Sequence, residues 1–486
     1  MHWNNTARKL GWIAGGFVAG IAISLQIPAL AERETRGLPV EELRTFAEVF
    51  NAIKQGYVEP VEDKKLITNA ISGMLSNLDP HSAYLDAESF KELQVGTHGE
   101  FGGLGIEVGS EDGYVKVVSP IEDTPAFRAG LKPGDLIIKI DDVSIKGVSL
   151  NDAVKKLRGK PKTQVRLGIF RKSEGQPFDV TLTREVIKVQ SVKSKAIEPG
   201  YGFLRVTQFQ EGTAGDLARK LTELNKAAPL KGLVLDLRND PGGLLHAAVG
   251  VSTIFLQPKL LITSTDGRTP DAKREYRSIS ADYARSAHDE LLKDLPEIAK
   301  TVPLVVLING GSASASEIVA GALQDHKRAV IMGTQSFGKG SVQTVLPLPG
   351  DTAIKLTTAR YYTPSGRSIQ AKGIAPDIVV EDTVEGSLGN MRLREIDLDG
   401  HLDNDKEKVG ATTPVPADEK TDSRQDKEKP HGQPAPKKPG KESGKDGKPA
   451  NEEATPARIE YGSKNDYQFT QALNLLKGLS ILQSKP

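Results

Sequence analysis

A serine cluster and an isolated lysine are the residues of this chain whose types and spacing could do chemistry. The apolar run 302–308 predicts a buried strand, and the apolar spacing that follows predicts a helix over 315–324. Ser314 therefore lies at a strand-to-helix turn, where unpaired N–H groups such as that of Ala315 can stabilise an oxyanion. One helix and one strand later, Lys339 stands between two glycines. The pair predicts a serine hydrolase whose general base is a lysine.

A lysine that acts as a base must first lose its charge. Its free pKa is about 10.4, so only about one lysine in a few thousand is neutral at pH 7. Desolvation can lower this pKa by up to about 3 to 5 units when no carboxylate compensates. The neighbouring residues 337–342 contain no acid. We therefore expect burial to lower the pKa of Lys339, so that its neutral amine takes the Ser314 proton and later protonates the leaving amine.

Three other interpretations of these segments stay open. Ser314 and Glu317 fit a helix capping box, in which the serine serves only as a cap. A Ser-His-Asp triad needs a histidine, and among the eight only His246, which follows a glycine pair, merits a test. Residues 333–339 match the GxxxxGK part of a phosphate loop. There, however, Gly340 replaces the magnesium-binding Ser or Thr, and a strand is expected where the motif needs a helix.

Two long segments, GSASASEIVAGALQD and FGKGSVQ, resemble the carboxy-terminal processing proteases, also called tail-specific proteases. The resemblance runs from about residue 46 to 401 and resumes near the C-terminus. It implies that Ser314 is the nucleophile, Lys339 the base and Gln343 the residue that orients the lysine. Ser312 and Ser316 would be supporting residues. The resemblance implies no metal and no cofactor.

The oxyanion hole needs a second donor besides the amide of Ala315. A buried-strand pattern over 233–237 leads into the loop 238–243, which ends in Gly242 and Gly243. The resemblance implies that one of these two glycine amides faces the scissile carbonyl; a tight turn that needs glycine dihedrals is the alternative. The family more often has asparagine where Asp240 stands, so this carboxylate is expected to turn away from the oxyanion.

The region from about 100 to 185 resembles a PDZ domain. Leu104, Gly105 and Ile106 belong to a glycine-rich segment that is similar to the loop whose amides hold a peptide's terminal carboxylate. Such domains add the bound peptide to a sheet as an extra strand. The segment 129–140 is equally typical of a PDZ domain. A helix is predicted over 149–157, and it places Ala153, Val154 and Leu157 along a groove that would take an apolar terminal side chain.

The fold class predicted for the whole chain is multidomain α+β. Strands and helices alternate over 201–324, which predicts an α/β sandwich with mostly parallel strands. An inserted PDZ domain and a helical domain built from N- and C-terminal segments complete the prediction. The expected divisions are a signal peptide or anchor (1–31), an N-terminal helical domain (32–98), the PDZ domain (99–188), the catalytic core (189–400), a disordered linker (401–460) and a C-terminal helix (461–486).

Composition and the leader indicate where the protein works. Basic residues precede an apolar stretch over 10–30 that ends in a small-residue cleavage site, which predicts export and a periplasmic location in a bacterium. Contact with the inner membrane is expected only if this leader stays uncleaved. The chain has no cysteine, which excludes disulfides and thiolate chemistry. Its 64 basic and 63 acidic residues give a net charge of +1, which argues against a nucleic-acid partner.

The predicted function joins these parts. A PDZ module captures the apolar C-terminus of a protein substrate, and the Ser/Lys site cleaves upstream of the captured end through an acyl-enzyme. An adaptor protein is a conceivable further partner, and the amphipathic terminal helices either mediate homo-oligomerisation or pack on their own domain. Two other function classes stay open: a PDZ adaptor with an inactive protease core, and an acyl-handling enzyme of the related crotonase architecture.

Overall fold

The structure, a computed structural model, describes residues 39–285, 287–383, 393–406 and 460–483. Contacts within the chain divide it into two units, residues 1–74 and 75–486. The predicted leader lies outside the described residues. In the first unit, helix α2 (Val40–Gly56) has no buried residue, and helix α3 (Asp63–Ser76) follows after a short turn. An ion pair between Lys54 and Asp63 joins the two helices at 2.8 Å.

A six-stranded sheet forms the centre of the second unit. Its order is β10-β11-β12-β15-β16-β19, and every neighbouring pair is parallel except β10 with β11. The sequence prediction of a mostly parallel sheet is therefore confirmed. The strands are β10 (Val192–Glu198), β11 (Tyr201–Val206), β12 (Gly232–Asp236), β15 (Leu304–Ile308), β16 (Val330–Gly333) and β19 (Ile378–Val379).

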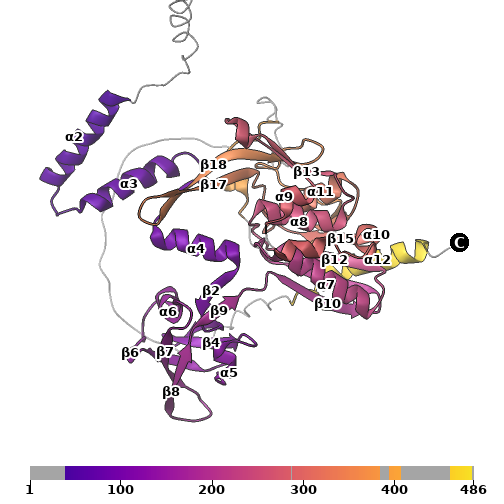
Figure 1. Cartoon of the computed structure of the whole chain (residues 1–486), viewed down its shortest axis with the longest axis horizontal. Helices are drawn as coiled ribbons and strands as arrows, with labels where there is room; N and C mark the ends of the chain where they lie inside the picture. Colours follow the sequence, from indigo (N-terminus) through magenta and orange to yellow (C-terminus); the bar gives the residue numbers. More distant parts are fainter. Residues whose placement is uncertain (1–38, 286, 384–392, 407–459, 484–486) are drawn as a thin grey trace, which may run out of the picture. The chain divides into compact units, whose positions relative to one another are not determined.

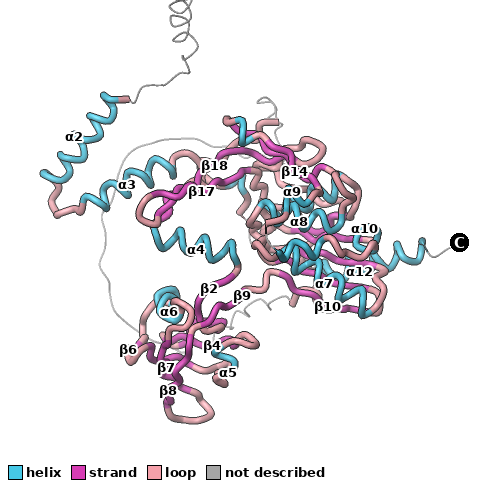
Figure 2. Tube along the Cα trace, viewed as in Figure 1, coloured by secondary structure: helices cyan, strands magenta, loops and turns pink. Residues whose placement is uncertain are grey.

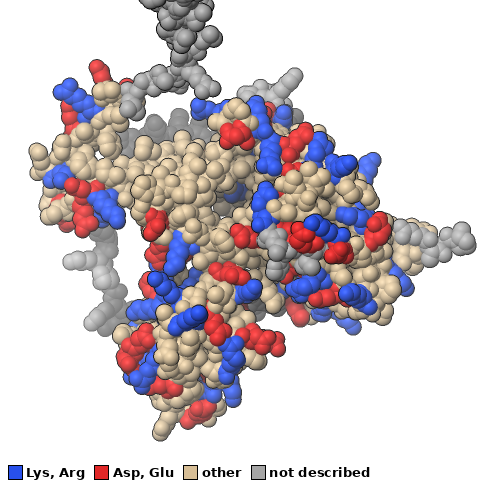
Figure 3. All heavy atoms as spheres, viewed as in Figure 1, with Lys and Arg blue, Asp and Glu red and all other residues tan. Residues whose placement is uncertain are grey.

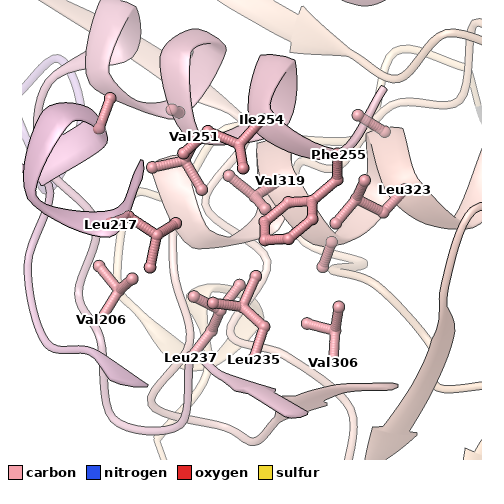
Figure 4. Packing of buried hydrophobic residues seen from close by; sticks show 14 of the residues in the cluster. Val206, Leu217, Leu235, Leu237, Val251, Ile254, Phe255, Val306, Val319 and Leu323 are labelled. Carbon is pink, nitrogen blue, oxygen red and sulfur yellow. The ribbon is translucent and has the colours of Figure 1, made fainter. Parts of the chain in front are cut away.

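Helices cover both faces of this sheet (Figures 1 and 2). On one face lie α7 (Thr213–Ala227), α8 (Leu245–Phe255) and α11 (Ala315–Asp325). Leu235 of β12 points into their shared core, where Phe255 of α8 packs close to Val319 of α11 (Figure 4). Successive residues of a strand face opposite sides of the sheet. The preceding residue, Val234, therefore packs on the other face of the sheet, against Phe469 of the C-terminal helix.

The C-terminal helix α12 (Tyr467–Gln483) is part of this core. Its buried residues Phe469, Ala472 and Leu476 pack on the face of β12, β15 and β16. A buried clamp holds its start: Arg238, which follows β12, bonds Asp466 at 2.6 and 2.8 Å. Of the two arrangements expected for this helix, packing on its own domain is the one observed. The helix thus belongs to the second unit, whereas α2 and most of α3 belong to the first.

A second sheet carries the segment that follows the isolated lysine. Its order is β1-β18-β13-β14, and β17 also pairs with β18. Strands β1 and β13 pair with different stretches of β18, and β17 runs along the edge of β18 opposite to both. The strands are β1 (Ala83–Leu85), β13 (Leu261–Gly267), β14 (Arg274–Arg277), β17 (Ser341–Leu348) and β18 (Thr352–Tyr362). Short helical turns complete the core: η2 (Pro270–Ala272), α9 (Ser280–Tyr283), η3 (Ala287–Leu292), α10 (Ile298–Thr301) and η4 (Glu395–Asp397).

The predicted PDZ region forms a small sheet with its own hydrophobic core. After helix α4 (Ala87–His98), strands β2 (Glu100–Gly103) and β9 (Glu185–Lys188) pair at the base of the region. The sheet comprises β3 (Ile106–Glu111), β4 (Tyr114–Pro120), β5 (Leu136–Ile140), β6 (Val143–Ser144), β7 (Gln164–Phe170) and β8 (Pro177–Thr183). Helices α5 (Pro125–Arg128) and α6 (Leu150–Leu157) lie beside it.

The start of the predicted linker is ordered on the core. Leu402 O accepts from Gln370 Nε2 at 3.0 Å, and Asn404 Nδ2 donates to Gln370 O at 2.8 Å. Residues 407–459 of the predicted linker lie outside the described residues. Within the described ranges no helix combines the length and apolar character that a membrane crossing requires. Positive and negative side chains are interspersed over the visible surface (Figure 3), and the net charge is +1.

Candidate active site

Ser314 sits at the turn between β15 and α11, as the sequence predicts. Its backbone has φ 56° and ψ −110°, a conformation that a residue with a Cβ rarely adopts. Such strain persists only where the surroundings enforce it, and it is concentrated at functional sites. The residue is 6% exposed. The turn thus holds a nearly buried serine at the start of a helix.

Hydrogen bonding separates Ser314 from the two neighbouring serines. Ser312 Oγ donates to Leu237 O at 2.8 Å, and Ser316 Oγ donates to Asp240 O at 2.9 Å. Both hydroxyls therefore tie the serine turn to the loop after β12. The Ser314 hydroxyl instead interacts with the buried phenol of Tyr361 on β18. Of these three serines, only Ser314 has a hydroxyl that does not donate to a backbone carbonyl.

Glu317 connects the serine turn to the lysine segment. Its buried carboxylate accepts from the amide of Ser314 at 2.8 Å and from the amide of Lys339 at 2.9 Å, both on Oε2. Oε1 accepts from Ser336 Oγ at 2.6 Å and from the Gly338 amide at 2.7 Å. The capping box is therefore present, but it does more than cap α11. It brings the backbones of Ser314 and Lys339 together.

Burial dominates the electrostatics of Lys339. Desolvation lowers the pKa of its amine, and the charge of Lys355 on β18 lowers it further. Three carboxylates act in the opposite direction: Glu395, Glu317 and Asp79. Among the hydrogen bonds of the described residues, none involves the Lys339 amine. The amine is therefore not bound to the Ser314 hydroxyl in this conformation.

Gln343 lies on β17, and among the described residues no hydrogen bond joins its side chain to Lys339. Its amide nitrogen donates to Ser341 Oγ at 2.9 Å and to Thr357 Oγ1 at 3.3 Å. Thr357 in turn donates to Asp79 Oδ1 at 3.0 Å. The structure thus places Gln343 in a polar chain leading to the segment before β1. The predicted orientation of the lysine by Gln343 stays a prediction.

The glycine pair lies directly against the serine turn. A Cβ on Gly242 would come within 2.7 Å of Ala313 O and 2.8 Å of the Ala315 amide nitrogen, so only glycine fits here. The Gly242 amide is already used, because it donates to Asp240 Oδ1 at 2.8 Å. In the described part of the chain, no hydrogen bond engages the amides of Gly243 and Ala315. These two amides are therefore free to donate to a bound group, and their role as oxyanion donors stays a prediction.

Asp240 does not present a charge to this hole. The residue is fully buried, and its Oδ2 has no hydrogen-bond partner. Burial raises the pKa of Asp240 to about 8. Its carboxyl group is therefore neutral at pH 7, which removes the unfavourable charge that the sequence suggested.

Sequence reasoning missed two residues beside the lysine segment, His81 and Glu395. His81 was placed outside the catalytic region, but its Nε2 lies 2.8 Å from Glu395 Oε2. Glu395 is buried and its amide donates to Phe337 O at 3.1 Å. No local pattern signals this pair, because the two residues are far apart in the sequence and meet only through the fold.

The two remaining interpretations, a Ser-His-Asp triad and a phosphate loop, find no support here. His246 lies at the start of α8, where burial lowers its pKa and the nearest charges are Arg285, Asp289 and Glu211. No hydrogen bond among the described residues links it to Ser314. After Gly340 the chain enters strand β17, as expected, so the helix of a phosphate loop is missing.

The PDZ region contains a groove at the predicted position. A pocket of about 210 Å³ is bordered by Leu104, Gly105 and Ile106 on one side and by Val154 and Leu157 of α6 on the other. Ala153, expected to line it, is fully buried in the core of the region instead. The Arg158 guanidinium stacks over the Phe101 ring, 4.6 Å from its centre, at the same pocket.

Family models match three parts of the chain. The model of peptidase family S41 matches residues 200–380, a PDZ domain model matches residues 102–182, and a model of the activating protease CtpB N-terminal domain matches residues 23–89. These matches fall on the core, the small sheet region and the N-terminal segment.

Whole proteins are similar over most of the chain. The carboxy-terminal-processing protease of Bartonella bacilliformis is 47% identical over 417 residues, which cover 84% of this chain and 92% of that protein. The carboxy-terminal processing protease CtpB of Bacillus subtilis is 35% identical over 377 residues, which cover 76% of this chain and 74% of that protein. Among solved structures, the photosystem II D1 C-terminal processing protease is 30% identical. The match covers 69% of this chain and 92% of that protein, with a TM-score of 0.39. The chain therefore belongs to the carboxy-terminal processing proteases, serine proteases of peptidase family S41 that carry a PDZ domain.

Proposed function

We propose that this protease uses Ser314 as nucleophile and neutral Lys339 as general base. The observation that carries the proposal is the shared acceptor: the amides of both residues donate to Glu317 Oε2, at 2.8 and 2.9 Å. Their nitrogens are therefore no further apart than the two bonds together. Burial lowers the pKa of the Lys339 amine, which favours the neutral form that a base needs.

The reaction follows from these positions. Lys339 Nζ takes the proton of Ser314 Oγ as the oxygen attacks the scissile carbonyl, and the amides of Ala315 and Gly243 hold the oxyanion. The ammonium then gives its proton to the leaving amine, which leaves an acyl-enzyme on Ser314. Lys339 next activates a water that releases the acyl group. Because the amine and the hydroxyl are not bonded here, a side-chain movement must precede the first step.

The PDZ groove supplies the substrate class. We propose that it binds the apolar C-terminal residue of a protein, with the amides of the segment 103–106 facing the terminal carboxylate. The groove is lined by aliphatic side chains from both walls, among them Val154 and Leu157. The cation of Arg158 lies at the same pocket, which favours a negatively charged chain end. Cleavage of the tail upstream of this anchor follows.

One experiment tests both halves of the proposal. The purified full chain is incubated with an internally quenched, unstructured peptide that ends in apolar residues, and with the same peptide amidated at its C-terminus. We expect cleavage of the first, weaker cleavage of the second, and none by Ser314→Ala or Lys339→Ala. Cleavage that survives either substitution refutes the dyad. A protein that binds the peptide but never cleaves it would be the inactive adaptor.

Export and assembly are part of the proposal. The leader predicts a periplasmic protein, and N-terminal sequencing of the protein isolated from cells shows whether cleavage follows residue 31. The exposed apolar residues of α2, among them Leu43, Phe46 and Val49, favour a second copy as their partner. Sedimentation of the wild type beside Phe46→Ser measures that association. A monomer in both cases contradicts it.

A further inference from the structure

Glu395 is bonded to the chain on both sides of Lys339, directly on one side and through Gln370 on the other. Its amide donates to Phe337 O at 3.1 Å. On the other side, Gln370 Nε2 donates to Glu395 Oε1 at 2.9 Å, while Gln370 Oε1 accepts from the Gly340 amide at 3.0 Å. The chain is therefore bonded to Glu395 two residues before the lysine, and it is linked to Glu395 through Gln370 at the residue after the lysine. The carboxylate itself is buried beside this segment, with a side chain that is 1% exposed.

The imidazole of His81 lies against this carboxylate. Its Nε2 lies 2.8 Å from Glu395 Oε2 and 3.0 Å from Oε1, and its side chain is 15% exposed. The backbone of His81 is fixed as well, since its amide donates to Asp79 Oδ1 at 2.8 Å. A buried carboxylate is costly unless it is paired and hydrogen-bonded. The segment before β1 thus delivers an imidazole to a carboxylate of the lysine site.

The charge on Glu395 affects Lys339 directly. Glu395 is foremost among the carboxylates that raise the pKa of the amine, ahead of Glu317 and Asp79, whereas burial and Lys355 lower it. A bare carboxylate at this place would favour the ammonium form, which cannot accept a proton from a serine. A carboxylate paired with a histidinium presents almost no net charge.

We propose that His81 is the counter-ion of Glu395, and that the pair positions Lys339 and sets the charge its amine faces. The two are positioning residues that act through the lysine and touch no substrate. The inference rests on the proposed role of Lys339 as the base. It gives the segment between α3 and β1 a part in catalysis, although it lies far before the catalytic core in the sequence.

The pH profile of kcat/KM tests this pairing. His81→Gln keeps a hydrogen-bond donor for Glu395 but removes the cation, so we expect the acid limb to move up by about 0.5 to 1 pH unit. Glu395→Gln removes the anion and should move the limb down by a similar amount. His98→Gln is the matched control, because His98 also pairs with a glutamate, Glu211 at 3.5 Å, but on the surface of another part of the chain. Its limb should not move.

The substrate is the quenched peptide described above, and melting temperatures verify that each variant is folded. Opposite shifts in the two variants support the pairing, and His81→Gln carries the test alone if Glu395→Gln does not fold. An unmoved acid limb in His81→Gln, or shifts of the same sign in both, overturns it. Activity that survives Lys339→Ala would instead overturn the proposed function, so the two failures are distinguishable.

Discussion

Replacing Glu317 by glutamine should disable the site without unfolding the protein. The carboxylate accepts four donors, and a glutamine has only one carbonyl oxygen. Its best orientation keeps that oxygen on the amides of Ser314 and Lys339, and then its NH2 group faces the Gly338 N–H. Because two donors cannot bond each other, the segment that carries Lys339 must move.

The magnitudes separate activity from stability. A buried N–H left without an acceptor costs about 1–3 kcal/mol. In the opposite direction, burial raises the pKa of Glu317 from 4.5 to about 7, so glutamine relieves a buried charge worth about 3 kcal/mol above that pH. These contributions largely cancel in the free energy of unfolding. A displacement of about 1 Å at the reacting groups, however, costs roughly 100-fold in rate.

The assay measures kcat/KM on the quenched peptide at a pH of about 8.5, where the wild-type carboxylate is ionised. We expect Glu317→Gln to lose about 100-fold, with a melting temperature within about 5 °C of the wild type. Asp216→Asn is the control, since Asp216 also lies in the first turn of a helix but is paired with Arg219 at the surface. An activity within about threefold of the wild type would refute the role given to Glu317.

Three further predictions concern the oxyanion loop, the PDZ groove and the C-terminal helix. Burial raises the pKa of Asp240 to about 8. Between about pH 4 and pH 8 the folded protein therefore holds a proton at Asp240 that the unfolded chain has lost, so the contribution of this group to the free energy of unfolding falls as the pH rises. Asp240→Asn should therefore melt increasingly above the wild type across that range, and a pH-independent difference would contradict this. Gly105→Ala should abolish binding of the apolar peptide in calorimetry, because the new Cβ would lie 2.2 Å from Thr124. Gly130→Ala is the control: Gly130 also has a positive φ, but its Cβ would meet no other atom, so peptide binding should be retained. Asp466→Ala leaves the buried Arg238 with Asp236, which Arg205 also shares, as its remaining carboxylate. The substitution should lower the free energy of unfolding in urea by about 3–5 kcal/mol, and a loss below about 1 kcal/mol would argue against the clamp.

Local patterns in the sequence predicted the elements that carry the chemistry. The apolar run before Ser314, the capping box with Glu317 and the glycines around Lys339 are each readable within a few residues. They gave the strand, the turn, the helix and the following strand, which the structure confirms. Such signals are local because strand periodicity and helix capping depend on neighbours in the chain.

The connections between these elements could not be predicted in the same way. Glu317 was recognised as a cap, but its bonds to the lysine segment depend on how α11 packs against the loop before β17. His81 reaches Glu395 only because β1 pairs with β18. The direction of Gln343 depends on the neighbouring Thr357. These are choices of tertiary packing, which spacing along one sequence does not encode.

The account depends on a neutral amine at Lys339, and its titration is the most direct test. The carbon and nitrogen resonances of lysine side chains report protonation by NMR, and the signal missing from Lys339→Met identifies the relevant one. We predict a midpoint below the ordinary value of about 10.4, because the amine is buried beside Lys355. A midpoint at or above that value in the folded, active enzyme would contradict the proposed mechanism.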